Sequence, residues 1–215
     1  MKFFKNATMA MCAGVIAAIA LTIATSVFND SADAQTATKP AELKSAASFS
    51  AIKDDSARAV ALFEEAGKVI NSPRCMNCHP ATDRPTQTDK MRPHIPLVVR
   101  GEGGMGAAGG LACNTCHHDT NYDAANVPGH PKWHLAPAEM AWQGKSLGQI
   151  CEQIKDPARN GGKDIAGIVK HMAEDDLVGW GWAPGGNRTP APGTQKAFGE
   201  LFKAWAEAGA ACPKS

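Results

Sequence analysis

The feature that most constrains this chain is a short cysteine–histidine pattern that occurs twice. Residues 75–79 read Cys-Met-Asn-Cys-His and residues 113–117 read Cys-Asn-Thr-Cys-His, so both are C-x-x-C-H. Two thiols three positions apart on a helical turn can each form a thioether with one vinyl group of a porphyrin. The histidine that follows can then bind the iron as its proximal ligand. The pattern therefore predicts two covalent c-type haems, bound by Cys75, Cys78 and His79 and by Cys113, Cys116 and His117.

Two other sites use C-x-x-C pairs. Two such pairs are typical of a Cys₄ zinc site, and a single pair is typical of a redox-active dithiol. Neither needs a histidine directly after the second cysteine, yet both copies have one. Open thiolates also tend to oxidise in an exported protein. We therefore favour haem over zinc and over a dithiol.

The N-terminus has the layout of a secretory signal peptide. Lys2 and Lys5 precede an uncharged apolar run from Met9 to Phe28, and Ala32-Asp33-Ala34 forms a small-x-small cleavage site. This layout predicts that residues 1–34 are a cleaved Sec-type signal peptide and that the mature protein is periplasmic. Retention of the apolar run as a membrane anchor is the alternative.

Removal of residues 1–34 leaves six of the seven cysteines. Cys151 and Cys212 lie outside the two motifs, and in an oxidising compartment this even remainder predicts a disulfide between them. The composition excludes one class of partner: 22 basic residues oppose 21 acidic ones, so the charge gives no reason to expect nucleic-acid binding.

Hydrophobic periodicity predicts a mainly α fold with long irregular loops and negligible strand. Residues 35–55 read as a flexible linker, and 56–215 as a single domain. A helix beginning at Ser56 would bury one apolar stripe, which we expect to pack against the first porphyrin. Further helices are expected over 138–142, 146–154, 164–172 and 194–208, with an irregular loop over 179–193. The stripe consists of Ala59, Leu62, Phe63, Ala66, Val69 and Ile70.

Each haem also needs a distal axial ligand, or has an open position there. The chain needs about ten residues to pass around a porphyrin rim. His94 follows His79 by 15 residues and His134 follows His117 by 17. We therefore expect His94 at the first haem and His134 at the second, with the crossed assignment open.

Other side chains compete for these positions. His171 belongs to a helical pattern and is a third distal candidate, while Met140 and Met91 are thioether alternatives. His118 reads as a surface residue or a propionate partner, and His130 reads as a surface residue. Six arginines are candidates to pair with porphyrin propionates, although surface solvation is the commoner role: Arg74, Arg84, Arg92, Arg100, Arg159 and Arg188.

One further motif is set aside. Gly101, Gly103 and Gly106 match G-x-G-x-x-G, but no strand precedes them, so the match does not predict a nucleotide site. We expect a flexible loop there.

Several segments together resemble a known family. They are residues 74–80, 92–94 (Arg-Pro-His), 133–137 (Trp-His-Leu-Ala-Pro), 155–162 and 180–182 (Trp-Gly-Trp). These resemble small exported dihaem cytochromes labelled as the cytochrome-like subunit of isoquinoline 1-oxidoreductase, over nearly all of residues 70–213. The resemblance implies electron transfer with a periplasmic molybdenum hydroxylase or another cytochrome.

The residues themselves predict a one-electron carrier with two low-spin haems and no catalytic residue. The alternatives are a dihaem peroxidase or a gas-binding haem protein, and both need an open sixth position on iron. Proteins that resemble dihaem peroxidases are larger and have widely separated motifs, whereas these motifs begin 38 residues apart, at 75 and 113.

Overall fold

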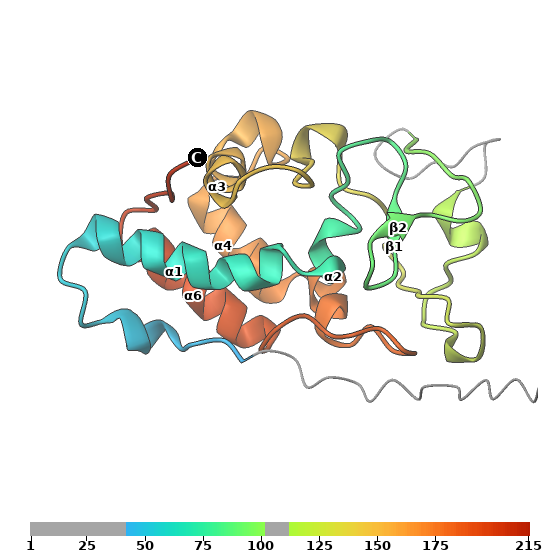
Figure 1. Cartoon of the computed structure of the whole chain (residues 1–215), viewed down its shortest axis with the longest axis horizontal. Coiled ribbons are helices and arrows are strands. Elements are labelled where there is room, and N and C mark those ends of the chain that lie inside the picture. Colours follow the sequence, from blue (N-terminus) through green and yellow to red (C-terminus); the bar gives the residue numbers. More distant parts are fainter. Residues whose placement is uncertain (1–41, 102–111) are drawn as a thin grey trace, which may run out of the picture. The chain divides into compact units, whose positions relative to one another are not determined.

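Helices supply most of the secondary structure in residues 42–101 and 112–215, which are the residues that the computed structural model describes. The α-helices are α1 (Asp55–Ile70), α2 (Pro73–Met76), α3 (Leu147–Lys155), α4 (Ile165–Glu174), α5 (Asp176–Gly179) and α6 (Gln195–Glu207) (Figure 1). Single 3-10 turns are η1 (Ala46–Phe49), η4 (Cys113–Thr115), η5 (Asp123–Ala125), η6 (Ala138–Met140), η7 (Pro157–Arg159) and η8 (Trp180–Trp182).

Strand content in this part of the chain is small. Strands β1 (Thr86–Gln87) and β2 (Arg92–Pro93) pair antiparallel, with Thr86 opposite Pro93. The expectation of a mainly α fold is therefore confirmed. No helix in the two described ranges has the length and apolar content needed to cross a bilayer. The signal peptide expected over residues 1–34 lies outside those ranges.

The helix starts follow from side-chain caps. Asp54, Asp164 and Thr194 each accept a hydrogen bond from a backbone N–H in the first turn of α1, α4 and α6. Ser146 and Gln149 form a reciprocal capping box at the start of α3. These bonds satisfy N–H groups that have no partner within the helix, which fixes where each helix begins.

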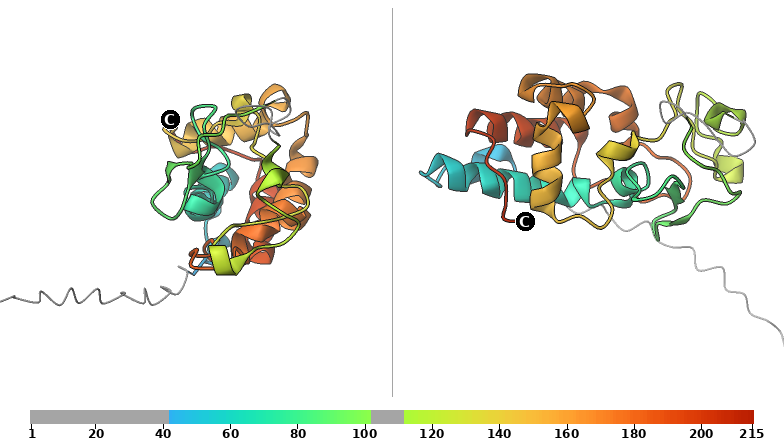
Figure 2. Two further views of the ribbon diagram at one scale, coloured as in Figure 1. Left: turned by 90° about the vertical axis from the view of Figure 1, so that its right-hand side faces the viewer. Right: turned by 90° about the horizontal axis from the view of Figure 1, so that it is seen from above.

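The core is built where α1 and α6 lie side by side (Figures 1 and 2). All six residues of the predicted α1 stripe are buried. Phe63 on this stripe packs against Phe202 and Trp205 of α6, at ring-centroid distances of 5.8 and 5.3 Å. We expected the stripe to pack against a porphyrin; instead it contacts α6, and none of its residues lines the cavity described below.

The segment before α1 is ordered where the structure describes it. We expected residues 35–55 to form a flexible linker, but η1 lies within it. The side chains of Leu43, Ala46 and Phe49 pack against the core. The Ala- and Ser-rich sequence shows no helical or strand period, so these contacts could not be predicted from it. The three apolar side chains hold the segment against the core. Residues 35–41 are outside the described ranges.

Part of the loop expected over 179–193 is also helical, since α5 ends at Gly179 and η8 follows it. Asp175 caps α5 by accepting from the N–H of Val178 (3.0 Å). The indole of Trp182 donates to the carbonyl oxygen of Pro192 (2.9 Å). A local cap and a bond within the segment therefore hold a Gly- and Pro-rich stretch that has little helical propensity of its own.

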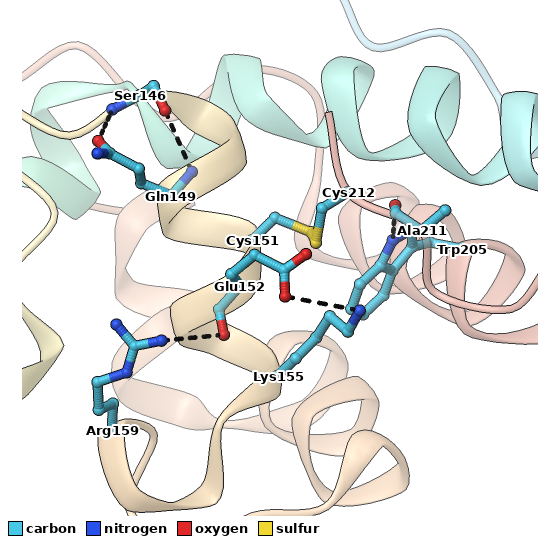
Figure 3. Close-up of a disulfide and its surroundings, with 9 residues drawn as sticks. All are labelled: Ser146, Gln149, Cys151, Glu152, Lys155, Arg159, Trp205, Ala211 and Cys212. Atoms are coloured by element: carbon cyan, nitrogen blue, oxygen red, sulfur yellow. Dashed lines mark hydrogen bonds and ion pairs between the residues drawn. A yellow bond between two sulfur atoms is a disulfide. The ribbon is translucent and has the colours of Figure 1, made fainter. Parts of the chain in front are cut away.

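A disulfide joins Cys151 on α3 to Cys212, beyond α6, as the even remainder of cysteines predicts (Figure 3). Cys151 is fully buried. The C-terminal segment passes very close to α3, because a Cβ atom at Gly148 would lie 2.4 Å from the carbonyl oxygen of Pro213. Only glycine permits this approach, so residue 148 and the disulfide together hold the C-terminus on α3.

We predict that replacing Cys151 and Cys212 by alanine lowers the free energy of unfolding by about 4 kcal/mol, because the disulfide closes a loop of 61 residues. Urea unfolding without reductant measures this loss. The parent protein with reductant is the matched control and should fall to the level of the variant. An unchanged unfolding midpoint in the variant would contradict the prediction.

Candidate functional site

The first C-x-x-C-H motif lies on α2 and the turn that follows it. The N–H groups of Cys78 and His79 both donate to the carbonyl oxygen of Cys75, at 3.1 and 3.2 Å, so the motif winds as one helical turn. Pro73 begins this helix, at a position where its missing N–H costs nothing. One short helix therefore presents both thiols and the imidazole.

Two contacts fix the imidazole of His79. Its Nδ1–H donates to the carbonyl oxygen of Met140 (2.7 Å), and its ring stacks on the indole of Trp142 at a centroid distance of 3.7 Å and an interplanar angle of 5°. Because a carbonyl oxygen can only accept, Nδ1 carries the proton and Nε2 keeps its lone pair. Metal-bound histidines are commonly held in this way, by a hydrogen bond from the other ring nitrogen.

The first motif faces a cavity of about 480 Å³. This volume is in the range of cofactor and ligand pockets. Cys75, Cys78 and His79 form part of its wall and keep intermediate exposure because they face this space. The rest of the wall comes mainly from residues 132–142, α3, α4, α5, η8 and α6, and its aromatic members are Trp133, Trp142, Trp180, Trp182 and Phe198.

Burial shifts the protonation of this motif. It raises the pKa of the Cys75 thiol to about 12 and that of Cys78 to about 11, and it lowers the pKa of His79 to about 4. All three groups are therefore uncharged at neutral pH. A neutral imidazole is the form that binds a metal. The protonated thiols, by contrast, are not thiolates and so are poor ligands for a bare metal ion.

The second motif repeats the histidine arrangement in a different setting. The N–H of His117 donates to the carbonyl oxygen of Cys113 (3.0 Å), again as a helical turn. Its Nδ1–H donates to the carbonyl oxygen of Pro128 (2.7 Å), and its ring stacks on Trp133 at a centroid distance of 4.9 Å. Cys116 is exposed, so the second motif is more open to solvent than the first.

His94 lies next to the second motif. Its ring centroid is 5.9 Å from that of His117, with the rings at 61°. Its Nδ1–H donates to the carbonyl oxygen of Pro96 (2.9 Å). Sequence spacing placed His94 opposite His79, but His94 is not part of the wall around the first motif. The position of His94 beside His117 matches the crossed assignment that spacing left open.

His134 and His171 are both in the wall of the cavity that His79 faces. Sequence spacing favoured the second motif for His134, and this position matches the crossed assignment instead. The Nδ1–H of His134 donates to the carbonyl oxygen of Lys132 (2.5 Å). His171 projects from α4, with Nδ1 3.4 Å from a carboxylate oxygen of Asp175. The first motif therefore has two candidate imidazoles available to it.

Three arginines carry buried N–H groups that have no hydrogen-bond partner among the described residues: Nε of Arg74, Nη1 of Arg100 and both Nε and Nη2 of Arg188. Arg74 lines the cavity and also pairs with Asp89. Burial lowers the pKa of Arg188; the charge of Arg74 lowers it further, and Asp89 and Asp123 counter this. Buried N–H donors of positively charged arginines are stabilised by a bound anion when they have no other acceptor. The carboxylates of porphyrin propionates are anions of this kind.

The other three arginine candidates have different roles. Arg84 donates from Nε and Nη2 to the carbonyl oxygen of His94, at 3.1 and 2.6 Å. Arg159 borders the cavity but pairs with Asp156 (2.7 Å). Arg92 is exposed on β2.

The thiols do not gather as a zinc site would require. In residues 42–101 and 112–215, no three His, Cys, Asp or Glu side chains form a group that could hold a bare metal ion. The two cysteine pairs therefore remain separate in this structure. Gly103 and Gly106 of the expected flexible loop are outside the described ranges.

Comparison with known proteins adds no relative: no protein-family model, no curated protein and no solved structure matches this chain. Sequence reasoning also missed the contacts that hold the two motif histidines. The carbonyl groups of Met140 and Pro128 have no sequence signature, because every residue has one. Trp133 and Trp142 were visible only as aromatic residues that follow a motif by more than ten positions.

We predict that Arg74→Met lowers the reduction potential of a haem at the first motif by roughly 50 mV, because a nearby positive charge favours the reduced form. Spectroelectrochemical titration measures the shift, and far-UV circular dichroism checks the fold. Arg58→Met is the matched control, since Arg58 pairs with Asp55 on α1 (2.5 Å) and does not line the cavity. Equal potentials in both variants would contradict the prediction.

Proposed function

We propose that this chain is an exported electron-transfer protein that binds two covalent c-type haems. The first would be held by Cys75, Cys78 and His79, and the second by Cys113, Cys116 and His117. One observation carries the proposal: both motif histidines donate Nδ1–H to a backbone carbonyl at 2.7 Å and stack on a tryptophan.

This shared arrangement is informative because the surroundings of the two motifs differ. The carbonyls belong to Met140 and Pro128, and the indoles to Trp142 and Trp133. Two different environments select the same tautomer of histidine and stack its imidazole on an indole. This is expected if each imidazole serves as a metal ligand. A c-type haem bound there supplies reversible one-electron exchange.

The chain gives the two sites different environments. The first motif faces a cavity walled largely by indole, phenyl and aliphatic side chains, whereas Cys116 of the second motif is exposed. Burial and local charge are among the properties by which a protein sets the potential of a haem. We therefore expect two distinct potentials, with the second site as the one that a partner protein reaches.

The compartment and partner are part of the same proposal. The predicted signal peptide and the Cys151–Cys212 disulfide both favour an oxidising, periplasmic location. The resemblance to small exported dihaem cytochromes favours a redox enzyme as partner, such as a periplasmic molybdenum hydroxylase, or another cytochrome.

Production with the c-type maturation machinery tests the proposal. We expect the purified protein to exceed the mass of the processed polypeptide by two haems and to show only low-spin ferric signals in paramagnetic resonance. Cys113→Ala/Cys116→Ala should remove one haem and leave the other. Colourless protein would contradict the proposal. A resting high-spin signal together with carbon monoxide binding would favour a peroxidase or a gas-binding protein.

A second prediction concerns the sixth ligand at the first motif, which we assign to His134 or His171. In a variant that lacks the second motif cysteines, alanine at the ligating position should convert the remaining haem to high spin, because an axial imidazole is lost. Alanine at the other position should leave it low spin. Low-spin spectra in both variants would favour a methionine such as Met140.

A further inference from the structure

We propose that His94 and His117 are the two axial ligands of the second haem, so that the loop before the second motif supplies its distal imidazole. The inference rests on the proposed function and reverses the assignment that spacing suggests. It concerns two imidazoles whose rings lie close together, and four features of the chain carry it.

The first feature is the separation of the rings. Two imidazoles that bind one metal from opposite sides, each at about 2 Å from nitrogen to metal, have ring centroids about 6 Å apart. The observed separation is 5.9 Å. The 61° angle between the rings is compatible with this, because each ring can rotate about its own bond to the metal without changing the distance.

The second feature is the protonation pattern. His94 donates Nδ1–H to Pro96 and His117 donates Nδ1–H to Pro128, so Nε2 is the lone-pair nitrogen on both rings. The rings therefore cannot hydrogen-bond to each other through their Nε2 atoms. A positive centre between them satisfies both lone pairs, and this is the arrangement of two ligands around one metal.

The third feature is how firmly the chain positions His94. It follows β2 directly, and its N–H donates to the carbonyl oxygen of Pro85 (2.9 Å). Arg84 holds its carbonyl oxygen with two donors. The N–H of Ile95 donates to Gln87 on β1 (3.3 Å). These bonds fix the backbone at residues 94 and 95, so the imidazole of His94 starts from a defined position.

The fourth feature is reach. His94 precedes His117 by 23 residues (117 minus 94), which exceeds the about ten residues needed to pass around a porphyrin rim. The first motif has other candidate distal ligands. His134 and His171 line the cavity that His79 faces, whereas His94 does not line it.

The test uses the haem-loaded full chain and two single-site backgrounds. Cys75→Ala/Cys78→Ala leaves only the second haem, and Cys113→Ala/Cys116→Ala leaves only the first. We expect His94→Ala to convert all of the remaining iron to high spin in the first background and none of it in the second. Added imidazole should restore the low-spin signal. His130→Ala is the matched control, since Nδ1 of His130 accepts from Lys132 rather than donating.

A second variant guards against misfolding in the single-site backgrounds. In the otherwise unchanged dihaem protein, His94→Met should give one methionine–iron charge-transfer band and raise one of the two reduction potentials, because thioether ligation raises the potential relative to imidazole. Unchanged low-spin spectra with His94→Ala in the first background, or a changed spectrum in the second, would overturn the pairing alone. Protein without haem in every background would overturn the proposed function and the pairing with it.

Discussion

The interaction on which the two sites depend is the hydrogen bond from Nδ1 of each motif histidine to a backbone carbonyl. It selects the tautomer, orients the ring and leaves Nε2 with a lone pair, as a metal ligand requires. A carbonyl is a dependable acceptor because its position is set by the backbone, not by a flexible side chain. Met140 lies 61 residues from His79, so that imidazole is oriented by a long-range contact, whereas Pro128 lies only 11 residues from His117.

The candidate distal histidines lie near the motif that is farther from them in the sequence, not near the one that spacing suggested. The hairpin after the first motif carries His94 to the second site, and the segment after the second motif returns His134 to the cavity of the first. Trp133, beside His134, stacks on His117 and meets Trp180 edge-to-face at 4.8 Å. Trp133 and Trp180 also line the cavity, so the two sites share a wall of indoles.

Sequence patterns predicted much of this structure, because the burial of an apolar stripe and the start of a helix depend on residues that are close in the sequence. The α1 stripe, the disulfide and the helices over 146–154, 164–172 and 194–208 are close to their expected places. Spacing left two assignments open for His94 and His134, since the distance along a chain says how far a residue can reach and not in which direction it goes. The anchored segment at Leu43 and Phe49 was missed for a related reason: its contacts are tertiary and leave no period in the sequence.

The Cys151–Cys212 crosslink also imposes an order on maturation. Its two sulfurs meet only after α3 and the end of α6 have docked, whereas the thiols within each C-x-x-C pair are neighbours from the moment of synthesis. Close neighbours oxidise together far more readily than distant ones, because their effective concentration is higher. If the chain matures in an oxidising compartment, as proposed, the thiols of the two pairs have to be kept reduced or bonded to haem before they oxidise to each other.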